Sequence, residues 1–568
     1  MAAPIHPGSG TAKSTLAPRV PPRVARSRLG VAMALAVALL ISTPVIALFV
    51  LALGGDGADW PHLASNVLPR AFLTTMTLMA LVAALTASMG VISAWLVMSF
   101  DFPGRRFLSW ALVLPLAVPS YLAAYGYVEL LDYTGPVQSA IRWAFGFSSM
   151  RDYWFPDVRS VVGAAVVLSC VLYPYVYLST RLVFLMQGRS AADVARTLGA
   201  APLRVLARVT LPMARPAVVA GMSLALMETL NDVGAVEYLG VQTLTLSVFS
   251  TWLNRGSLEG AAQLACVMLF IVMALLMTER WARRRQRFHA NRTTAAAARP
   301  VRVGLLGWRA IATTLACGLP VMFGFVLPVI ALGGYAWRRP EGFLDPRLAD
   351  ALLNTVGIGL AAAVVSVIIA FALAWSIRQV FQRPVFIASR IAISGYAVPG
   401  TILALGLLYV LSGFDNAVDT FLRSHAGVSS GLLLSGTPAA IIIACVIRFL
   451  AVADGNVAAG FAKLSPNLDQ AARTLGHTPG ATLGRIILPL MRPAILTAAA
   501  LVFVDTTKEL SATILLRPFG FNTLATYVYE NASRAQVEDA VPAALVILMV
   551  SIVPALLLSR ELTDDRPD

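Results

Sequence analysis

Long apolar stretches recur along the whole 568-residue chain, and they constrain its fold more than any other feature. A bilayer span needs roughly 20 consecutive apolar residues, whereas helices of soluble proteins carry shorter, amphipathic patterns. The composition, with 58% hydrophobic and 13% charged residues, lies far from that of soluble domains, which have about 45–50% apolar and 25% charged residues. The sequence therefore predicts an all-α membrane protein embedded in a lipid bilayer.

Twelve of these stretches are expected to cross the bilayer, in two sets of six. They lie at 31–53, 72–98, 108–131, 159–185, 214–236, 261–279, 310–333, 352–377, 386–411, 437–453, 491–512 and 540–558. The first is longer than the roughly 7–15 apolar residues of a signal peptide, so we expect an uncleaved span. The predicted organisation is a flexible tail (1–28), a first repeat (29–280), a basic linker (281–308), a second repeat (309–560) and a C-terminal tail (561–568).

The net charge of +15 comes almost entirely from arginine, which gathers in alternate loops. Cytoplasmic loops of membrane proteins carry an excess of Lys and Arg. The arginine-rich segments are the N-terminal tail and residues 105–106, 181–215, 280–309 and 448–492. The intervening loops carry mostly acidic residues, although Arg142, Arg151, Arg338 and Arg339 are exceptions. The pattern predicts that both termini are cytoplasmic, and it explains the basic balance better than nucleic-acid binding does.

Neither the cysteines nor the histidines form a pattern typical of a metal or redox site. Each of the four cysteines lies in an apolar stretch without a CxxC pair, and the five histidines are scattered. No Gly-Lys dipeptide occurs in the sequence, although a P-loop requires Gly-Lys-Ser/Thr to hold phosphates. We therefore expect no cofactor bound by this chain and no ATP hydrolysis by that route.

The two halves are related in sequence, most clearly in one loop. Residues 193–217 match residues 470–494 at 13 of 25 positions without a gap. Because corresponding spans cross in the same sense, the halves are parallel repeats. The shared spacing is set by Asp193, Ala195, Gly199, Leu211 and Pro212 in the first copy and by Gln470, Ala472, Gly476, Leu488 and Pro489 in the second. A plain amphipathic connector would explain one such loop but not two with the same spacing.

Local signals predict a helix–turn–helix in each copy of this loop. A glycine is placed where a helix ends with positive φ, and a proline three residues later can open the next short helix. A second proline marks the start of the following span. These paired positions are Gly199 and Gly476, Pro202 and Pro479, and Pro212 and Pro489. The result would be a rigid knob outside the membrane that is tied directly to two spans.

The repeated loop resembles the EAA motif of inner-membrane permeases in binding-protein-dependent ABC importers. That motif is Glu-Ala-Ala, three residues, Gly, nine residues, Ile, one residue and Leu-Pro, and both copies keep its spacing. The departures are Asp193 and Gln470 for Glu, Val194 for Ala and Val209 for Ile. The resemblance implies a type I ABC importer permease fold, with twelve transmembrane helices as two parallel six-helix repeats in a bacterial inner membrane.

The same resemblance implies partners and a class of cargo. The two loops would dock on two copies of an ABC ATPase subunit, which uses ATP and Mg, and a periplasmic solute-binding protein would deliver the cargo. The fused twelve-span form is most similar to ferric-iron permeases, through residues 228–234 and 505–526. Thiamine or another small cation is the alternative cargo. An ion-gradient-driven secondary transporter also fits twelve spans in parallel halves, and a membrane receptor or scaffold is a third class.

Acidic side chains occupy equivalent positions in the fifth span of each half. The pairs are Glu228 and Asp232, and Asp505 and Glu509, each spaced i, i+4 and therefore on one helix face. A charge at membrane depth costs about 3 kcal/mol or more, so these groups should face a cavity or a partner. They could line a cation pathway, serve structure with Lys508 and Asn231 as partners, or contact the binding protein at the outer surface. Prolines 115, 119 and 399 could break the third spans near this pathway or form tolerated kinks.

Overall fold

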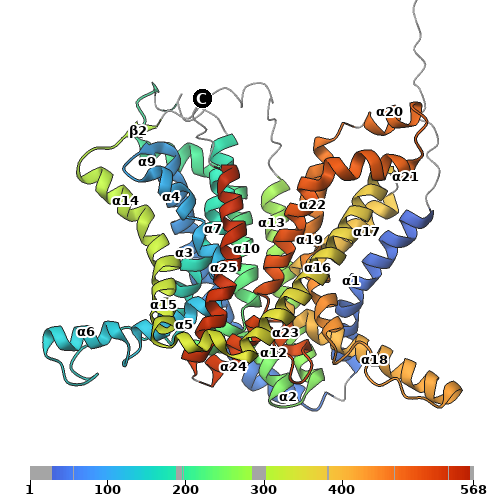
Figure 1. Ribbon diagram of the computed structural model, residues 1–568. Helices are drawn as coiled ribbons and strands as arrows, with labels where there is room; N and C mark the ends of the chain where they lie inside the picture. Colours follow the sequence, from blue (N-terminus) through green and yellow to red (C-terminus); the bar gives the residue numbers. More distant parts are fainter. Residues whose placement is uncertain are drawn as a thin grey trace, which may run out of the picture.

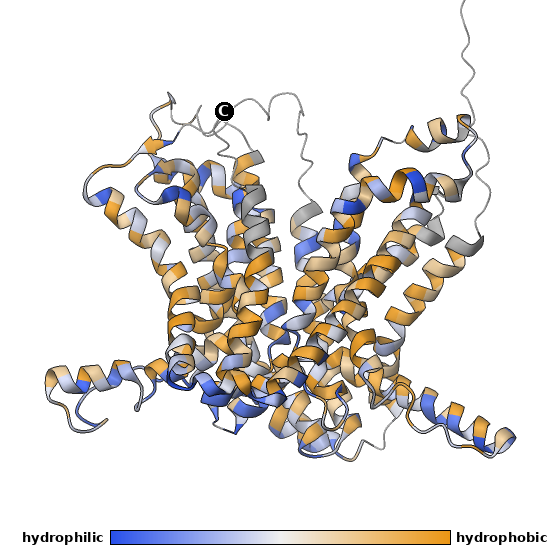
Figure 2. Cartoon of the chain, viewed as in Figure 1, coloured by the Kyte–Doolittle hydropathy of each residue, from blue (hydrophilic) through white to orange (hydrophobic). Residues whose placement is uncertain are grey.

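The computed structural model describes residues 28–54, 57–186, 195, 197–284, 302–379, 383–465, 467–534 and 536–562, and these form one helical bundle (Figure 1). Apolar residues dominate the middle of the bundle, and hydrophilic residues gather toward its two ends (Figure 2). Ten helices in this part of the chain are long and apolar enough to cross a bilayer, or eleven if one bent pair is a single span. The predicted all-α membrane fold is thus confirmed.

The first half of the chain folds into helices of different lengths and one short strand. Its elements are α1 (Arg28–Gly54), α2 (Trp60–His62), η1 (Leu63–Val67), α3 (Leu68–Ser99), β1 (Phe100–Asp101), α4 (Arg105–Ala111), η2 (Leu114–Ala117), α5 (Ser120–Leu131), α6 (Pro136–Phe145), α7 (Val161–Met186), α9 (Pro202–Val205), η3 (Leu206–Thr210), α10 (Leu211–Asn231), α11 (Gly234–Tyr238), α12 (Leu244–Leu253) and α13 (Leu258–Arg284).

The second repeat follows the same order. Its elements are β2 (Val303–Gly304), α14 (Trp308–Val321), η4 (Met322–Val326), α15 (Leu327–Arg338), η5 (Pro340–Leu344), α16 (Pro346–Gln379), α17 (Arg383–Ile393), η6 (Ser394–Ala397), α18 (Gly400–Ala426), α19 (Pro438–Lys463), α20 (Leu468–Thr474), α21 (Pro479–Thr482), η7 (Leu483–Ile487), α22 (Leu488–Thr507), α23 (Thr513–Leu516), α24 (Leu524–Ser533) and α25 (Val537–Leu562). The two-residue strands β1 and β2 pair in parallel. The twelfth predicted span coincides with α25, which has 26 residues.

The third span of each half, predicted over 108–131 and 386–411, is broken, so the first of the two alternatives for its prolines holds at Pro119 and Pro399. Pro119 precedes α5 and Pro399 precedes α18, and neither residue is helical. The residues before them, Val118 and Val398, are extended, because a proline ring excludes the helical conformation from its predecessor. In the first half the segments on either side of this break meet at 95°. Pro119 and Pro399 therefore break their helices, whereas Pro115 lies inside the 3-10 helix η2.

The fifth span of the first half also differs from the prediction. The expected span 214–236 ends early, because α10 stops at Asn231 and the short helix α11 starts separately at Gly234. In the other direction the helix extends well before residue 214, running from Pro202 to Asn231. In the second half the corresponding helix runs from Gly480 to Thr507. Each fifth span is thus continuous with the loop that precedes it.

The first helix of each repeat packs against the other repeat. Helix α1 contacts α17 and α18, and α15 contacts α5. A glycine permits each crossing: a Cβ on Gly406 would lie 2.1 Å from the Pro44 carbonyl oxygen, and one on Gly126 would lie 3.2 Å from Pro328 Cα. The sequence repeats at 29–280 and 309–560 are therefore not separate packing units, and the two halves are interlocked.

A buried threonine fixes the loop before α12 in the first repeat and the loop before α24 in the second in the same way. The Thr75 hydroxyl accepts a hydrogen bond from the Leu244 backbone N–H at 2.9 Å, and Thr355 accepts one from Leu524 at 2.8 Å. These contacts hold the start of α12 and α24 against α3 and α16. Thr75 and Thr355 end the similar runs Leu-Thr-Thr (73–75) and Leu-Asn-Thr (353–355), so this likeness between the halves reflects a shared structural role.

Replacing Thr75 by valine is expected to destabilise the protein by about 1–3 kcal/mol, because the buried Leu244 N–H would lose its partner. Thermal unfolding of the purified chain in detergent measures this change. Thr77→Val is the control, since the exposed Thr77 hydroxyl bonds only to the Leu73 carbonyl of its own helix. Equal midpoints for the two variants would contradict the proposed role of Thr75.

Candidate functional site

The two repeated loops lie at the same end of the bundle, where α9, α20 and α21 are found (Figure 1). Gly199 and Gly476 have φ values of 80° and 82°, so the predicted positive φ is confirmed in both copies. After each glycine the backbone closes the helix end with an equivalent bond, from Ala200 N to Ala195 O and from His477 N to Ala472 O, both 3.0 Å long. This six-to-one bond is the Schellman motif, which satisfies a terminal carbonyl. Asp193 lies outside the described residues.

The prolines of the loop act differently from the prediction. Pro202 and Pro479 do open the next helix. However, Pro212 and Pro489 do not start a new one, because a π-helical turn of five residues, η3 or η7, joins each short helix to its span. Proline cannot donate to the carbonyl four residues earlier and its ring clashes with it, so the preceding turn widens. The N–H of Leu211 accordingly bonds to Leu206 O, five residues back.

Sequence reasoning missed the exposed apolar residues of this surface. Leu198 and Leu475 occupy equivalent places beside the two glycines, and they are 81% and 79% exposed. The signal was present in the shared Ala-Arg-Thr-Leu-Gly run. By contrast, Gln470 is exposed and Ala472 is buried. Both loops therefore present a leucine outward at a rigid helix end.

A cavity of about 140 Å³ lies between the two halves. All five residues predicted for the substrate pathway line it, and they come from the ends of α10 and α22. They are Glu228, Asp232, Asp505, Lys508 and Glu509. Each continuous helix thus runs from a repeated loop at one end to carboxylates at the cavity.

In the second half, basic partners neutralise both acids. Glu509 pairs with Arg448 at 2.5 Å, and the two side chains are only 2% and 7% exposed. Glu509 also accepts hydrogen bonds from the backbone N–H groups of Ala512 and Thr513, at 2.9 and 3.0 Å. Asp505 pairs with Lys508 at 3.0 Å in a more accessible position. The structural interpretation with Lys508 as a partner therefore applies to Asp505.

Arg448 is the main residue that the sequence reasoning misplaced. Its position at one end of the segment 448–492 suggested a cytoplasmic loop. In the structure α19 continues to Lys463, and Arg448 is buried within it, facing the cavity. The same correction applies to Arg181, which is buried in α7 and donates to the Ser109 carbonyl at 3.0 Å. Because Arg181 and Arg448 are buried within long apolar helices, neither residue supports the assignment of a cytoplasmic loop from charge.

The first half presents its acids with fewer partners. Glu228 accepts a hydrogen bond from the Tyr396 hydroxyl at 3.3 Å. Asp232 accepts one from the Ala235 N–H at 2.8 Å, and its other oxygen has no hydrogen-bond partner in the described part of the chain. Both Asp232 and Glu509 are buried, which is inconsistent with acids displayed on the outer surface.

Asn231 joins the two halves beside the cavity. Its side-chain oxygen accepts from the Gly400 N–H at 2.7 Å, and its carbonyl accepts from the Ser511 hydroxyl at 2.6 Å. The predicted pairing of Asn231 with the acids is therefore not the contact it makes. Its hydrogen bonds instead join the end of α10 to the start of α18 and to the residues after α22.

Gly234 lines both the central cavity and a second cavity of about 260 Å³. A Cβ at this position would lie 2.8 Å from Leu510 Cδ2 and 3.0 Å from Tyr121 Cβ, so the space around Gly234 is tightly packed. The second cavity is also lined by Glu237, whose carboxylate accepts a 2.5 Å hydrogen bond from the Tyr529 hydroxyl. The close packing at Gly234 therefore involves residues of both halves, Tyr121 from the first and Leu510 from the second.

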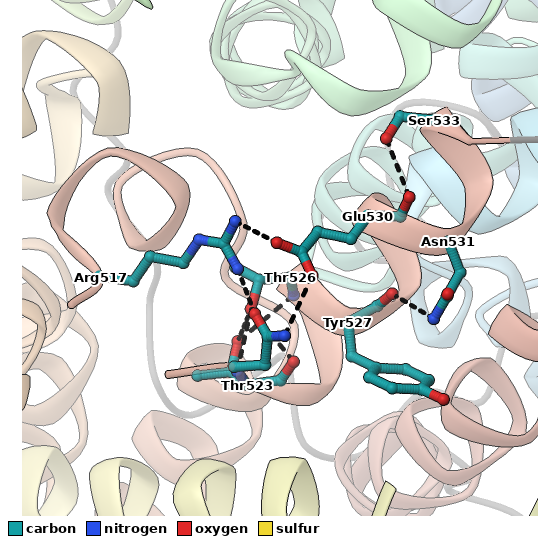
Figure 3. A network of polar contacts seen from close by, with 8 residues as sticks. Arg517, Thr523, Thr526, Tyr527, Glu530, Asn531 and Ser533 are labelled. Atoms are coloured by element: carbon teal, nitrogen blue, oxygen red, sulfur yellow. Dashed lines mark hydrogen bonds and ion pairs between the residues drawn. The ribbon is translucent and has the colours of Figure 1, made fainter. Parts of the chain in front are cut away.

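A polar network orders the loop around α24 in the second half (Figure 3). Arg517 pairs with Glu530 at 2.5 Å, and Asn522 donates to the same carboxylate at 3.0 Å. Thr523 and Thr526 form a capping box that begins α24. This network holds the loop that bonds to Thr355. In the described residues, no group of three or more His, Cys, Asp or Glu side chains is arranged to hold a metal ion.

Two interlocked helical repeats, a central polar cavity and paired loops at one end define a membrane transport protein. Two segments, residues 86–287 and 366–560, match the family described as "Binding-protein-dependent transport system inner membrane component". The chain belongs to this family. It is therefore a multi-pass inner-membrane permease component of a binding-protein-dependent transporter, as the EAA-like loops predicted.

Relatives differ in the cargo that their names state. The chain is 25% identical to the Fe(3+)-transport system permease protein FbpB 2 of Haemophilus influenzae, over 86% of this chain and 88% of the relative. It is 28% identical to the putative 2-aminoethylphosphonate permease PhnV of Salmonella paratyphi A, over 44% of this chain and 94% of the relative. The molybdenum permease ModB of Escherichia coli is 27% identical, over 39% of this chain and 96% of ModB. The last two thus match less than half of this chain.

Proposed function

We propose that this chain is the permease of an ATP-driven importer for ferric iron delivered by a periplasmic binding protein. The observation that carries the proposal is the acidic cavity. Four carboxylates and two basic side chains line it, leaving an excess of negative charge. Such a passage suits a hard cation, which prefers oxygen ligands, and it disfavours anions such as phosphonate or molybdate. The iron-transport relative that aligns along most of the chain gives further support.

The paired loops support docking to two ATPase subunits, one on each loop. Because the loops, the start of α1 and the end of α25 lie at the same end of the bundle, we place this end and both termini in the cytoplasm (Figure 1). ATP and Mg would be used by the partner subunits, and this chain would transmit their movement. The continuous helices Pro202–Asn231 and Gly480–Thr507 provide the route from each loop to the cavity.

Uptake of radioactive ferric iron tests the choice of cargo. The chain is expressed with its ATPase and binding protein in a host that lacks its own ferric-iron uptake. We expect uptake that is lowered by excess unlabelled ferric iron and unaffected by thiamine or molybdate. Uptake of labelled thiamine, with none of iron, would contradict the iron assignment and leave the importer assignment intact.

A further inference from the structure

The cavity is lined by equivalent positions of the two repeats, and their charges differ. Residues 161–232 align with residues 438–509 at a constant offset without a gap. Under this alignment Glu228 and Asp232 correspond to Asp505 and Glu509. The basic residues Arg448 and Lys508, however, correspond to uncharged ones. Their counterparts are Val171 and Asn231, and all of these positions line the cavity.

We infer that Glu228 and Asp232 alone contact the passing cation, whereas Asp505 and Glu509 form a neutral, fixed wall opposite them. This inference rests on the proposed function for its identification of a cation as the cargo. Among the described residues, neither Glu228 nor Asp232 takes part in a close ion pair, although Arg448 and Lys508 also attract the Glu228 carboxylate from farther away. The two acids of the second half each have a basic partner, at 2.5 and 3.0 Å.

The burial of Asp232 indicates a missing partner. The residue is 8% exposed and lines the cavity with Ser120, whose side chain interacts with the carboxylate, and its Oδ2 has no hydrogen-bond partner among the described residues. A buried polar atom left without a partner is unfavourable, and a buried charge more so. A cation in the cavity would supply that partner, with Glu228 in the last turn of α10, four residues before Asp232.

The small number of oxygen ligands suits transport better than storage. Two carboxylates at the end of α10, with the Tyr396 hydroxyl beside Glu228, provide a partial ligand set. Conduction requires a site favourable enough to enter and weak enough to leave. Each acid lies at or just beyond the end of α10, which continues into its docking loop. Movement of that helix would therefore change the spacing between these carboxylates and the opposite wall.

Terbium luminescence tests the asymmetry without requiring transport. Tb³⁺ is a hard trivalent cation, and Tyr121, Tyr175 and Tyr396 line the cavity, so tyrosine excitation should sensitise bound Tb³⁺. The full-length chain in detergent is titrated with Tb³⁺. The double variant Glu228→Gln with Asp232→Asn should weaken the sensitised signal at least about tenfold, because it removes both charged ligands. Asp505→Asn with Lys508→Gln, which removes one acid together with its basic partner, should weaken the signal much less.

Glu538→Gln with Asp539→Asn controls for carboxylates at the protein surface, since both are about half exposed beside Arg339. The inference would be overturned if the two cavity variants lost equal amounts of the Tb³⁺ luminescence. It would also be overturned if the Glu228/Asp232 variant lost none. The test also separates the two proposals. If Tb³⁺ bound at Glu228 and Asp232 but the chain imported no iron, the assignment of iron as the cargo would be wrong. The assignment of the cation site to these two residues would still hold.

Discussion

Glu509→Gln is expected to lower the free energy of unfolding by about 3–5 kcal/mol, because it leaves the buried Arg448 guanidinium without a counter-charge. The two side chains are nearly inaccessible, so water cannot replace the lost interaction. The glutamine would also hold the Ala512 and Thr513 N–H groups less strongly than the carboxylate. Thermal unfolding of the purified chain in detergent measures the change.

Asp505→Asn, four residues earlier and near the end of α22, is the matched comparison. Its pair with Lys508 is about 30% exposed, so its loss should change stability by about 0–1 kcal/mol. Replacing both Arg448 and Glu509 by leucine should restore much of the stability lost in Glu509→Gln, because the uncompensated charge is gone. If Glu509→Gln unfolded at the wild-type temperature, the buried Arg448–Glu509 pair would not stabilise the fold.

Gly476→Val is expected to reduce ATP-driven uptake at least about tenfold, because a branched side chain at positive φ costs about 1–2 kcal/mol or more and would distort the helix end. The space around a Cβ at this position is open, so the effect would come from the backbone and not from a clash. Gly199→Val should act in the same way in the first loop. Uptake and ATP hydrolysis are measured together, and hydrolysis should lose its dependence on the binding protein.

Gly480→Val is the control within the same loop. Gly480 also has open space around it, but its φ is not positive. This variant should therefore retain uptake and coupling. If Gly476→Val transported like Gly480→Val, the loop geometry would not carry the movement of the motor.

Local features of the fold could be predicted from the sequence where one residue type sets the backbone. The glycines of the two loops required positive φ, and the prolines at 119 and 399 broke their helices, because these residues restrict their own and neighbouring dihedral angles. The acidic residues at 228, 232, 505 and 509 were predicted as pathway residues from their equivalent positions in the two repeats, and all four line the cavity, although α10 and α22 end before Asp232 and Glu509.

Features that depend on distant partners could not be predicted. Arg448 could be recognised as a cavity residue only from the position of Glu509, which lies 61 residues away. Helices α1 and α15 each pack against the other repeat, and this packing depends on close helix crossings at Gly406 and Gly126. A single sequence does not show which helix crosses at either glycine. The π-helical turns before Pro212 and Pro489 arise from a continuous helix on both sides of each proline. The sequence reasoning had separated those helices.

The most direct test of the transport mechanism is uptake by the reconstituted complex with an active or an inactive motor. The full-length chain, its ATPase and its binding protein are placed in proteoliposomes, and cargo uptake is measured with ATP inside. Replacing the P-loop lysine of the ATPase should reduce uptake to the background level, because this chain contains no P-loop of its own. Uptake that continued with the inactive motor and followed an imposed ion gradient would contradict the account.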